Sequence, residues 1–165
     1  MSEFRIAILA ADRVFYEGPC ESLVVPTVLG QHGILANHSN MISALVPGTL
    51  MYRIPGKDMA MAAVSSGLVK IEDGDVLVLV DSAERPEDID ENRAKRAAAR
   101  AKEELLQKRS IQEYHSAQAQ LARAISRLQV KQHYYDGYGP GSGSHSKTKY
   151  RKNNSRTIQS PAVDV

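Results

Sequence analysis

The chain has 165 residues, of which 42% are apolar and 24% charged, a composition typical of a soluble globular protein with one ordinary domain or two small ones. No apolar run approaches the roughly 18 residues that a membrane-spanning helix needs, and the N-terminus lacks the pattern of a signal peptide, so we expect a cytoplasmic protein. The formal net charge of +2 comes from the last 32 residues, which hold five basic and two acidic side chains, and the near-neutral remainder argues against a nucleic-acid-binding domain.

Residues 1–86 contain nine short segments that are apolar or alternate between apolar and polar side chains. Turn-forming residues separate several of them, as at Gly18-Pro19, Pro47-Gly48 and Pro55-Gly56. Strands at this spacing are typical of an all-β sandwich rather than of alternating strands and helices. The expected strands span 4–9, 14–16, 23–25, 33–35, 41–45, 50–54, 59–64, 68–72 and 76–80.

The pattern of the chain changes between Val80 and Ala94. Before this stretch apolar residues alternate with period two, and after it they recur with helical spacing. Pro86 forbids further ladder pairing, and Asp88 and Glu91 stand where an N-cap and its reciprocal partner belong. We therefore expect a sheet domain to end at residue 86, with a hinge at 83–86.

Residues 89–133 predict two amphipathic helices joined by a short turn. The first is rich in alanine on one side, at Ala94, Ala97, Ala98 and Ala101, followed by Leu105. The second begins with a capping box at Ser110 to Glu113, and its apolar stripe is expected to comprise Ile111, Tyr114, Leu121, Ile125 and Leu128. An antiparallel hairpin of this kind has little core of its own, so it is a candidate moving part.

The segment 134–165 has the Gly-, Ser- and Lys-rich composition of a linker without periodicity, and we expect it to be disordered. The predicted fold class is therefore α+β. An antiparallel β-sandwich occupies residues 1–86, a two-helix hairpin follows at 87–133, and a basic tail completes the chain.

Signatures of catalysis are lacking in the sequence. There is no Gly-rich phosphate loop with its Lys, no Gly-x-Ser-x-Gly motif and no paired Cys or His at metal-ligand spacing. His32 and His38, six residues apart, are half of a metal site at most, and we interpret them as polar loop residues. Asp88, Asp90 and Glu91 are explained by the preference of carboxylates for a helix N-terminus. We predict neither a catalytic residue nor a metal site.

Arginine is distributed in two stripes. Arg93, Arg96 and Arg100 share one face of the first helix, and Arg123 and Arg127 share one face of the second. Helix statistics alone favour a solvated face. The alternatives are that the guanidinium groups border a groove that binds a polyanion such as a nucleotide phosphate chain, or that, together with the basic tail, they form a nucleic-acid-binding module.

Several motifs occur in a fixed order along residues 3–133. They are a Gly-x-x-Gly-Ile-Leu loop and a following His at 30–38, a Pro47-Gly48 turn, two strands at 66–71 and 76–84, and Ile89-Asp90-Glu91-Asn92-Arg93-Ala94 at the start of the helical hairpin. This succession resembles the epsilon subunit of bacterial rotary F-type ATP synthases, whose hairpin begins with Ile/Leu-Asp-x-x-Arg-Ala. The tail has no counterpart in that family.

The resemblance implies a ten-stranded sandwich and a helical hairpin on the central stalk, bound to the gamma subunit and resting on the c-ring through Leu29, Gly30, Gln31, His32 and His38. Catalysis then belongs to the alpha and beta subunits, and the chain couples ion flow to ATP synthesis. The hairpin of such subunits inhibits hydrolysis by extending into the alpha/beta hexamer. The chain is expected at the cytoplasmic face of the bacterial membrane, held there peripherally through the complex and without a nucleic-acid partner.

In family members that bind ATP, the nucleotide holds the hairpin down. The resemblance assigns this regulatory site to Glu84, Ile89, Asp90, Arg93, Ala94, Arg100, Arg123 and Arg127. No cofactor is required for the rotor function, and the sequence leaves open whether magnesium accompanies the ATP. Four residues depart from the family pattern: Asn37 and Asn40 replace the usual Gly and Pro, His32 replaces an apolar residue, and Ser66 replaces a Gly.

Overall fold

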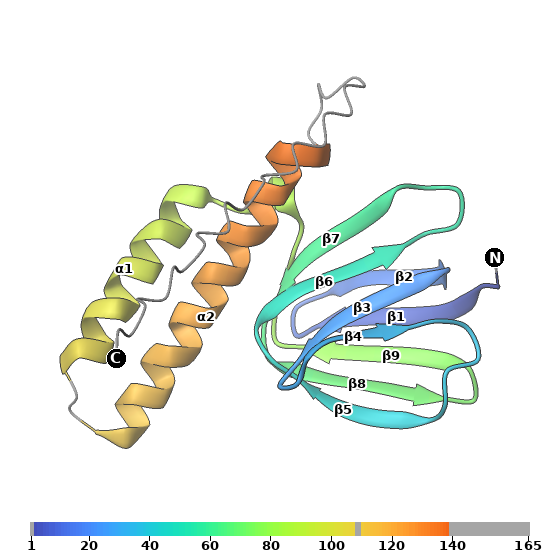
Figure 1. The fold of residues 1–165 in the computed structure, drawn as a ribbon, viewed down its shortest axis with the longest axis horizontal. Helices are drawn as coiled ribbons and strands as arrows, with labels where there is room; N and C mark the ends of the chain where they lie inside the picture. The colour runs from blue at the N-terminus through green and yellow to red at the C-terminus, as the bar shows by residue number, and fades with distance from the viewer. Residues whose placement is uncertain (1, 108–109, 139–165) are drawn as a thin grey trace, which may run out of the picture.

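The computed structural model describes residues 2–107 and 110–138, and in them ten strands are followed by two long helices (Figure 1). The strands are β1 (Phe4–Ala10), β2 (Val14–Cys20), β3 (Ser22–Thr27), β4 (Gly30–Ile34), β5 (Met41–Leu45), β6 (Gly48–Arg53), β7 (Met59–Val64), β8 (Gly67–Glu72), β9 (Asp75–Val80) and β10 (Ala83–Glu84). The helices are α1 (Glu91–Gln107) and α2 (Ile111–His133). The predicted fold class is confirmed. No helix in the described part of the chain is long and apolar enough to cross a membrane.

Hydrogen bonds join the strands in the order β10-β7-β6-β3-β5-β8-β9-β1-β2, with β4 paired to β3. Side chains alternate between the interior and the surface, so that Phe4, Ile6 and Ile8 of β1 are buried while Arg5, between Phe4 and Ile6, is exposed. The predicted antiparallel pairing has one exception, because β1 and β9 are parallel in the register Arg5↔Asp75 to Ala10↔Val80. This pairing joins the first long strand of the chain to the last.

The sheet ends in β10, a strand of two residues that the alternating pattern did not reveal. Ala83 and Glu84 pair with Val64 and Ala63 of β7, and Pro86 then begins a 3-10 turn, Pro86–Asp88. The helix N-cap is Asp90 and not Asp88 as predicted: the Asp90 carboxylate accepts a hydrogen bond of 3.0 Å from the Arg93 backbone N–H. The 3-10 turn accounts for the displacement, because it occupies the residues at which the helix was expected to begin.

The two helices form an antiparallel hairpin in which most of the buried residues are small. Ala94, Ala98 and Ala101 of α1 are buried, as predicted. The apolar stripe predicted for α2 is wrong, because Ile111, Tyr114 and Ile125 are exposed and the buried residues are Ala117, Ala124, Ser126 and Val130. An alanine face brings the helix axes close together, and small residues on the partner helix then fill the remaining space better than Leu or Ile. The N-cap at Ser110 is confirmed by the hydrogen bond from the Glu113 N–H to Ser110 Oγ, 3.1 Å.

Helix α2 lies between α1 and the sandwich (Figure 1) and packs against β6 and β7. The buried apolar contact there is small. It consists of Ala63 on β7, Ile89 in the connection and Val130 on α2, with Met61 partly buried beside them. Helical structure continues beyond α2 in a π-helical turn, Tyr134–Tyr138, within the segment that composition predicted to be disordered, and the rest of that segment lies outside the described residues.

Gly67 at the start of β8 tests how closely β8 and β9 approach each other in the sandwich. A Cβ atom there would lie 1.9 Å from the Leu79 carbonyl oxygen of β9, which is backbone and cannot rotate away. We predict that Gly67→Ala lowers the free energy of unfolding by at least about 1–3 kcal/mol, the usual cost of overpacking, in urea denaturation of the full chain.

The matched control is Gly33→Ala in β4, where a Cβ atom would meet nothing within 4 Å and φ is not positive. It is expected to leave the free energy of unfolding nearly unchanged. Equal losses in the two variants would show that the β8–β9 contact is not as close as described.

Candidate functional site

A cavity of about 420 Å³ opens where the hairpin leaves the sandwich. Its walls come from β10, from the connection to α1, from the first three turns of α1 and from α2. The lining residues are Glu84, Asp88, Ile89, Asp90, Arg93, Ala94, Arg96, Ala97, Arg100 and Arg127. Four of these are arginines and three are acidic, and the N-terminus of α1 contributes the positive end of its dipole, so the cavity favours an anionic ligand.

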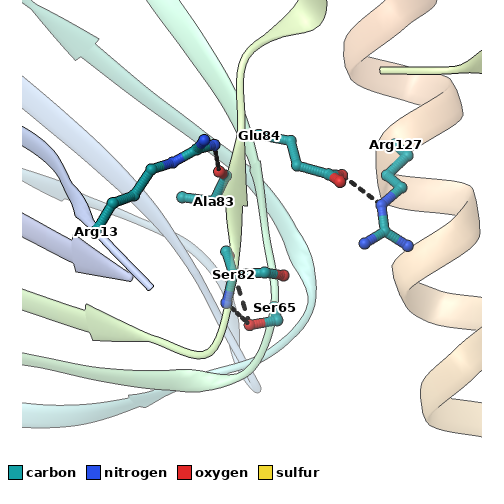
Figure 2. A network of polar contacts seen from close by, with 6 residues as sticks. All are labelled: Arg13, Ser65, Ser82, Ala83, Glu84 and Arg127. Carbon is teal, nitrogen blue, oxygen red and sulfur yellow. Dashed lines mark hydrogen bonds and ion pairs between the residues drawn. The ribbon is translucent and has the colours of Figure 1, made fainter. Parts of the chain in front are cut away.

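An ion pair between Glu84 and Arg127 crosses from the sandwich to the hairpin at this cavity (Figure 2). The two side chains are 32% and 31% exposed, so water screens the pair less than it screens the surface pairs of this protein. The bond is made by Arg127 Nε, and Figure 2 shows the two terminal guanidinium nitrogens directed away from Glu84. Arg127 therefore keeps donors for a second acceptor while it holds Glu84.

Neighbouring polar contacts fix the strand that carries Glu84. Arg13 of the β1–β2 turn donates to the Ala83 carbonyl over 3.0 Å, and the buried Ser65 hydroxyl accepts a 2.8 Å bond from the Ser82 N–H (Figure 2). The Ser65 N–H in turn donates to the Ser82 carbonyl over 3.1 Å. These bonds keep the two-residue strand β10 in place and so orient the Glu84 carboxylate.

A second polar contact lies one helical turn beyond Arg127. Lys131 Nζ donates to the Pro86 carbonyl over 3.0 Å, and this side chain is partly buried. Arg127 and Lys131 are i and i+4 on α2, so both project from the face that meets the sandwich. Together they hold α2 to the connection on either side of residue 85.

Two of the three carboxylates of the cavity, those of Glu84 and Asp90, make structural contacts. Asp90 caps α1 through the Arg93 N–H, and Glu84 binds Arg127. Neither is placed as a free general base, and among the residues described there is no group of three or more His, Cys, Asp or Glu side chains that could hold a metal ion. The arginines and the N-terminus of α1 make the arrangement suitable for binding an anion.

Seven of the eight residues predicted for the regulatory site line this one cavity. The eighth, Arg123, lines a smaller neighbouring depression with Ser65, Ser82, Glu84 and Arg127. The prediction left out Asp88, Arg96 and Ala97, which also line the cavity. Arg96 was already visible in the arginine stripe of α1, and its helical spacing from Arg93 and Arg100 was the signal that could have included it.

The residues predicted for the c-ring contact lie outside this cavity. Leu29 at the β3–β4 turn is 97% exposed, and Val28 beside it is also exposed. His32 and His38 come together, with their Nε2 atoms 3.2 Å apart. Asn37 adopts φ of +63°, a conformation that Gly takes easily and Asn tolerates, which explains how it replaces the family's Gly. Asn40 binds the Asp73 N–H over 3.0 Å.

Burial in the sandwich shifts the pKa values of Cys20 and Tyr52. Burial raises the pKa of the Cys20 thiol above its ordinary value, which keeps this residue a thiol at neutral pH. Burial also raises the pKa of the Tyr52 phenol, and the nearby Arg85 guanidinium acts in the opposite direction. Cys20 is therefore an inert core residue and not a nucleophile.

Comparison with known proteins gives one consistent family. Residues 3–86 match the model of the β-sandwich domain of the ATP synthase delta/epsilon chain, and residues 87–132 match the model of its long α-helix domain. The chain is 41% identical over 128 residues to the ATP synthase epsilon chain of Ruminiclostridium cellulolyticum, covering 78% of this chain and 95% of the relative. It is 38% identical over 133 residues to the epsilon chain of Shouchella clausii, covering 81% of this chain and 98% of that one.

A solved structure shares the fold. A chain in the cryo-EM structure of the Euglena gracilis mitochondrial ATP synthase, described as OSCP/F1/c-ring in rotational state 1, superposes with a TM-score of 0.70. The match covers 81% of this chain and 83% of the other at 21% sequence identity.

The contact between Glu84 and Arg127 can be tested with a double-mutant cycle on the full chain. We predict that Arg127→Leu and Glu84→Gln each lower the free energy of unfolding by about 1–3 kcal/mol, because each leaves a partly buried charged or polar group without its partner. Hydrogen exchange of the α2 amides is expected to accelerate at the same time.

The control is the exposed pair between Arg5 and Glu17, whose side chains are 71% and 53% exposed. Arg5→Leu should change stability by less than about 1 kcal/mol. A coupling energy of zero between Glu84 and Arg127 would contradict the role assigned to the pair.

Proposed function

The chain belongs to the ATP synthase delta/epsilon chain family, as an epsilon subunit of the rotary F-type ATP synthase, and we propose that it is a non-catalytic subunit whose helical hairpin inhibits ATP hydrolysis under the control of bound ATP. One observation carries the regulatory part: the cavity lined by arginines lies where the hairpin joins the sandwich. A ligand there contacts the hinge, α1 and α2 at once.

ATP fits the chemistry of this cavity. Arg93, Arg96 and Arg100 are exposed at the mouth of the site, and planar guanidinium groups suit bidentate contact with phosphate oxygens. Arg127 keeps its terminal nitrogens available while it binds Glu84. The apolar wall of Ile89, Ala94 and Ala97 provides a surface for the base or the ribose.

Ligand binding would couple to the position of the hairpin by mass action. ATP that binds the docked hairpin and not the released one stabilises the docked state by RT ln(1 + [ATP]/Kd), about 2.7 kcal/mol at 100 times Kd. The docked hairpin otherwise depends on a small apolar cluster and two polar contacts. A contribution of this size is therefore enough to decide between the two states.

The inhibited state follows from release of the hairpin. Once α2 separates from β7, Arg123 and Arg127 become free to bind acidic surfaces of the alpha and beta subunits, with the helices extended along gamma. The sandwich would remain on the rotor, bound to gamma and resting on the c-ring through the exposed Leu29 turn and His38. In the cell this places the chain at the cytoplasmic face of the membrane, through the complex. Four of the five striped arginines line one cavity instead of an extended face, which disfavours the nucleic-acid alternative.

Calorimetric titration of ATP into the full chain, with and without magnesium, tests the nucleotide site. We predict saturable binding that Arg93→Gln and Arg100→Gln each weaken roughly 10–100-fold, because each removes a charge-assisted contact of about 1.5–3 kcal/mol. Lys95→Gln is the control, since Lys95 lies on α1 but pairs with Glu91 and does not line the cavity. No binding at millimolar ATP, or equal weakening by all three changes, would remove the site.

The inhibitory role is tested in the reassembled ATP synthase. Deletion of residues 87–165 is expected to raise ATP hydrolysis several-fold, whereas deletion of residues 139–165, which leaves both helices, is expected to leave it unchanged. Each complex is analysed for one copy of the truncated chain, so that loss of the subunit is not mistaken for relief of inhibition. Hydrolysis unaffected by the longer deletion would leave this chain with coupling alone.

A further inference from the structure

Two histidines outside the nucleotide cavity face each other. His32 on β4 and His38 in the connection to β5 have their Nε2 atoms 3.2 Å apart, with ring centroids 5.3 Å apart and ring planes at 74°. Both side chains are half-buried, so each ring has a solvent-facing side. Their interpretation as independent polar loop residues does not account for this meeting of two ring nitrogens.

The backbone holds both residues in place. His32 lies opposite Val25 in the β3–β4 ladder. His38 closes a turn in which its own N–H donates to the Leu35 carbonyl over 3.2 Å, and Asn37 within that turn has φ of +63°. The Asn37 conformation reverses the chain, so that His38 returns toward the strand that carries His32. The pair is therefore preorganised by a strand and a closed turn.

The hydrogen bonds of His38 determine which of its nitrogens is free. The His38 Nδ1 atom lies 2.9 Å from the Ser39 carbonyl oxygen, which only accepts, so Nδ1 carries the proton. In the neutral ring Nε2 then presents a lone pair toward His32. A bond from the second ring nitrogen to a backbone carbonyl is also the arrangement that orients metal-bound histidines.

The separation of the two nitrogens matches that of two ligands on one ion. Nitrogen ligands at about 2.0–2.1 Å from a tetrahedral metal are about 3.3–3.4 Å apart. The observed 3.2 Å needs only a small opening of the pair. We propose that His32 and His38 chelate one divalent transition-metal ion through their Nε2 atoms, the proton now shared between the rings being displaced to solvent or to His32 Nδ1.

The surroundings define the class of ion. No cluster of three or more His, Cys, Asp or Glu side chains exists in the part of the chain that the structure describes, so water completes the coordination. Imidazole ligands without carboxylates favour Cu²⁺, Ni²⁺ and Zn²⁺ over Mg²⁺ and Ca²⁺, with Cu²⁺ bound most tightly. A bound ion would tie β4 to the 35–40 turn. This inference does not depend on the nucleotide site.

The test is calorimetric titration of ZnCl₂, NiCl₂, CuCl₂ and MgCl₂ into the full chain after treatment with EDTA. We expect one site that prefers copper, with no heat from magnesium. His32→Gln and His38→Gln should each weaken binding roughly 100-fold, because loss of one donor removes the chelate effect. The matched control is a variant in which the three other histidines are changed, His115→Gln, His133→Gln and His145→Gln, and it should bind as the unaltered chain does.

A second measurement guards against misfolded variants. In the unaltered chain, added Zn²⁺ should move the ring NMR signals of His32 and His38 and leave those of His115 and His133 in place. Retention of full affinity in both single variants, loss of the site in the triple variant, or movement of the helix histidines instead would overturn the proposal.

Discussion

The ion pair between Arg127 and Glu84 is the contact on which the relation between sandwich and hairpin depends. The sandwich has a core of nineteen buried residues, whereas the apolar cluster that joins hairpin to sandwich has three buried residues, Ala63, Ile89 and Val130. So small an apolar contact cannot fix an orientation, because hydrophobic attraction has no preferred direction. The directional contacts from Arg127 to Glu84 and from Lys131 to Pro86 supply it.

The same ion pair also connects the docking of the hairpin to ligand binding, because Arg127 both binds Glu84 and lines the cavity. Arg127 uses Nε for Glu84, so its two terminal nitrogens, which point away from that carboxylate, stay available to a second acceptor. A lysine in this place would have a single ammonium group for both tasks and no fixed fork. The polar bonds around Ser65, Ser82 and Ala83 matter for the same reason, since they hold the two-residue strand from which Glu84 projects. The backbone contacts of β10 thus position the Glu84 carboxylate, and Glu84 in turn positions Arg127 at the proposed ligand site.

Period-two and helical patterns predicted the nine longer strands and the two helices, because an element that buries one face carries apolar residues at the matching spacing. Helical spacing also placed the arginines of each helix on one face, but it did not show that four of them line one cavity. Features set by tertiary contact were missed. Strand β10 is too short to show a period, and the first turn of α1 is displaced by the 3-10 turn at Pro86. The large residues of α2 form the most apolar stripe, yet Ala117 and Ala124 are buried while Ile111 and Ile125 are exposed. The meeting of His32 with His38 required the backbone of Asn37, which spacing alone does not encode.

The parallel pairing of β1 with β9 has a consequence for how the chain acquires its structure. Residues 5–10 cannot complete their ladder until residues 75–80 have left the ribosome, and closing so long a loop is slow compared with forming local contacts. The hairpin needs only neighbours within its own sequence, so α1 and α2 can form as soon as they are made. During synthesis β1 can pair with β2, but its other edge stays unpaired until β9 has been made. In that period the nascent chain is most prone to aggregation through the exposed edge.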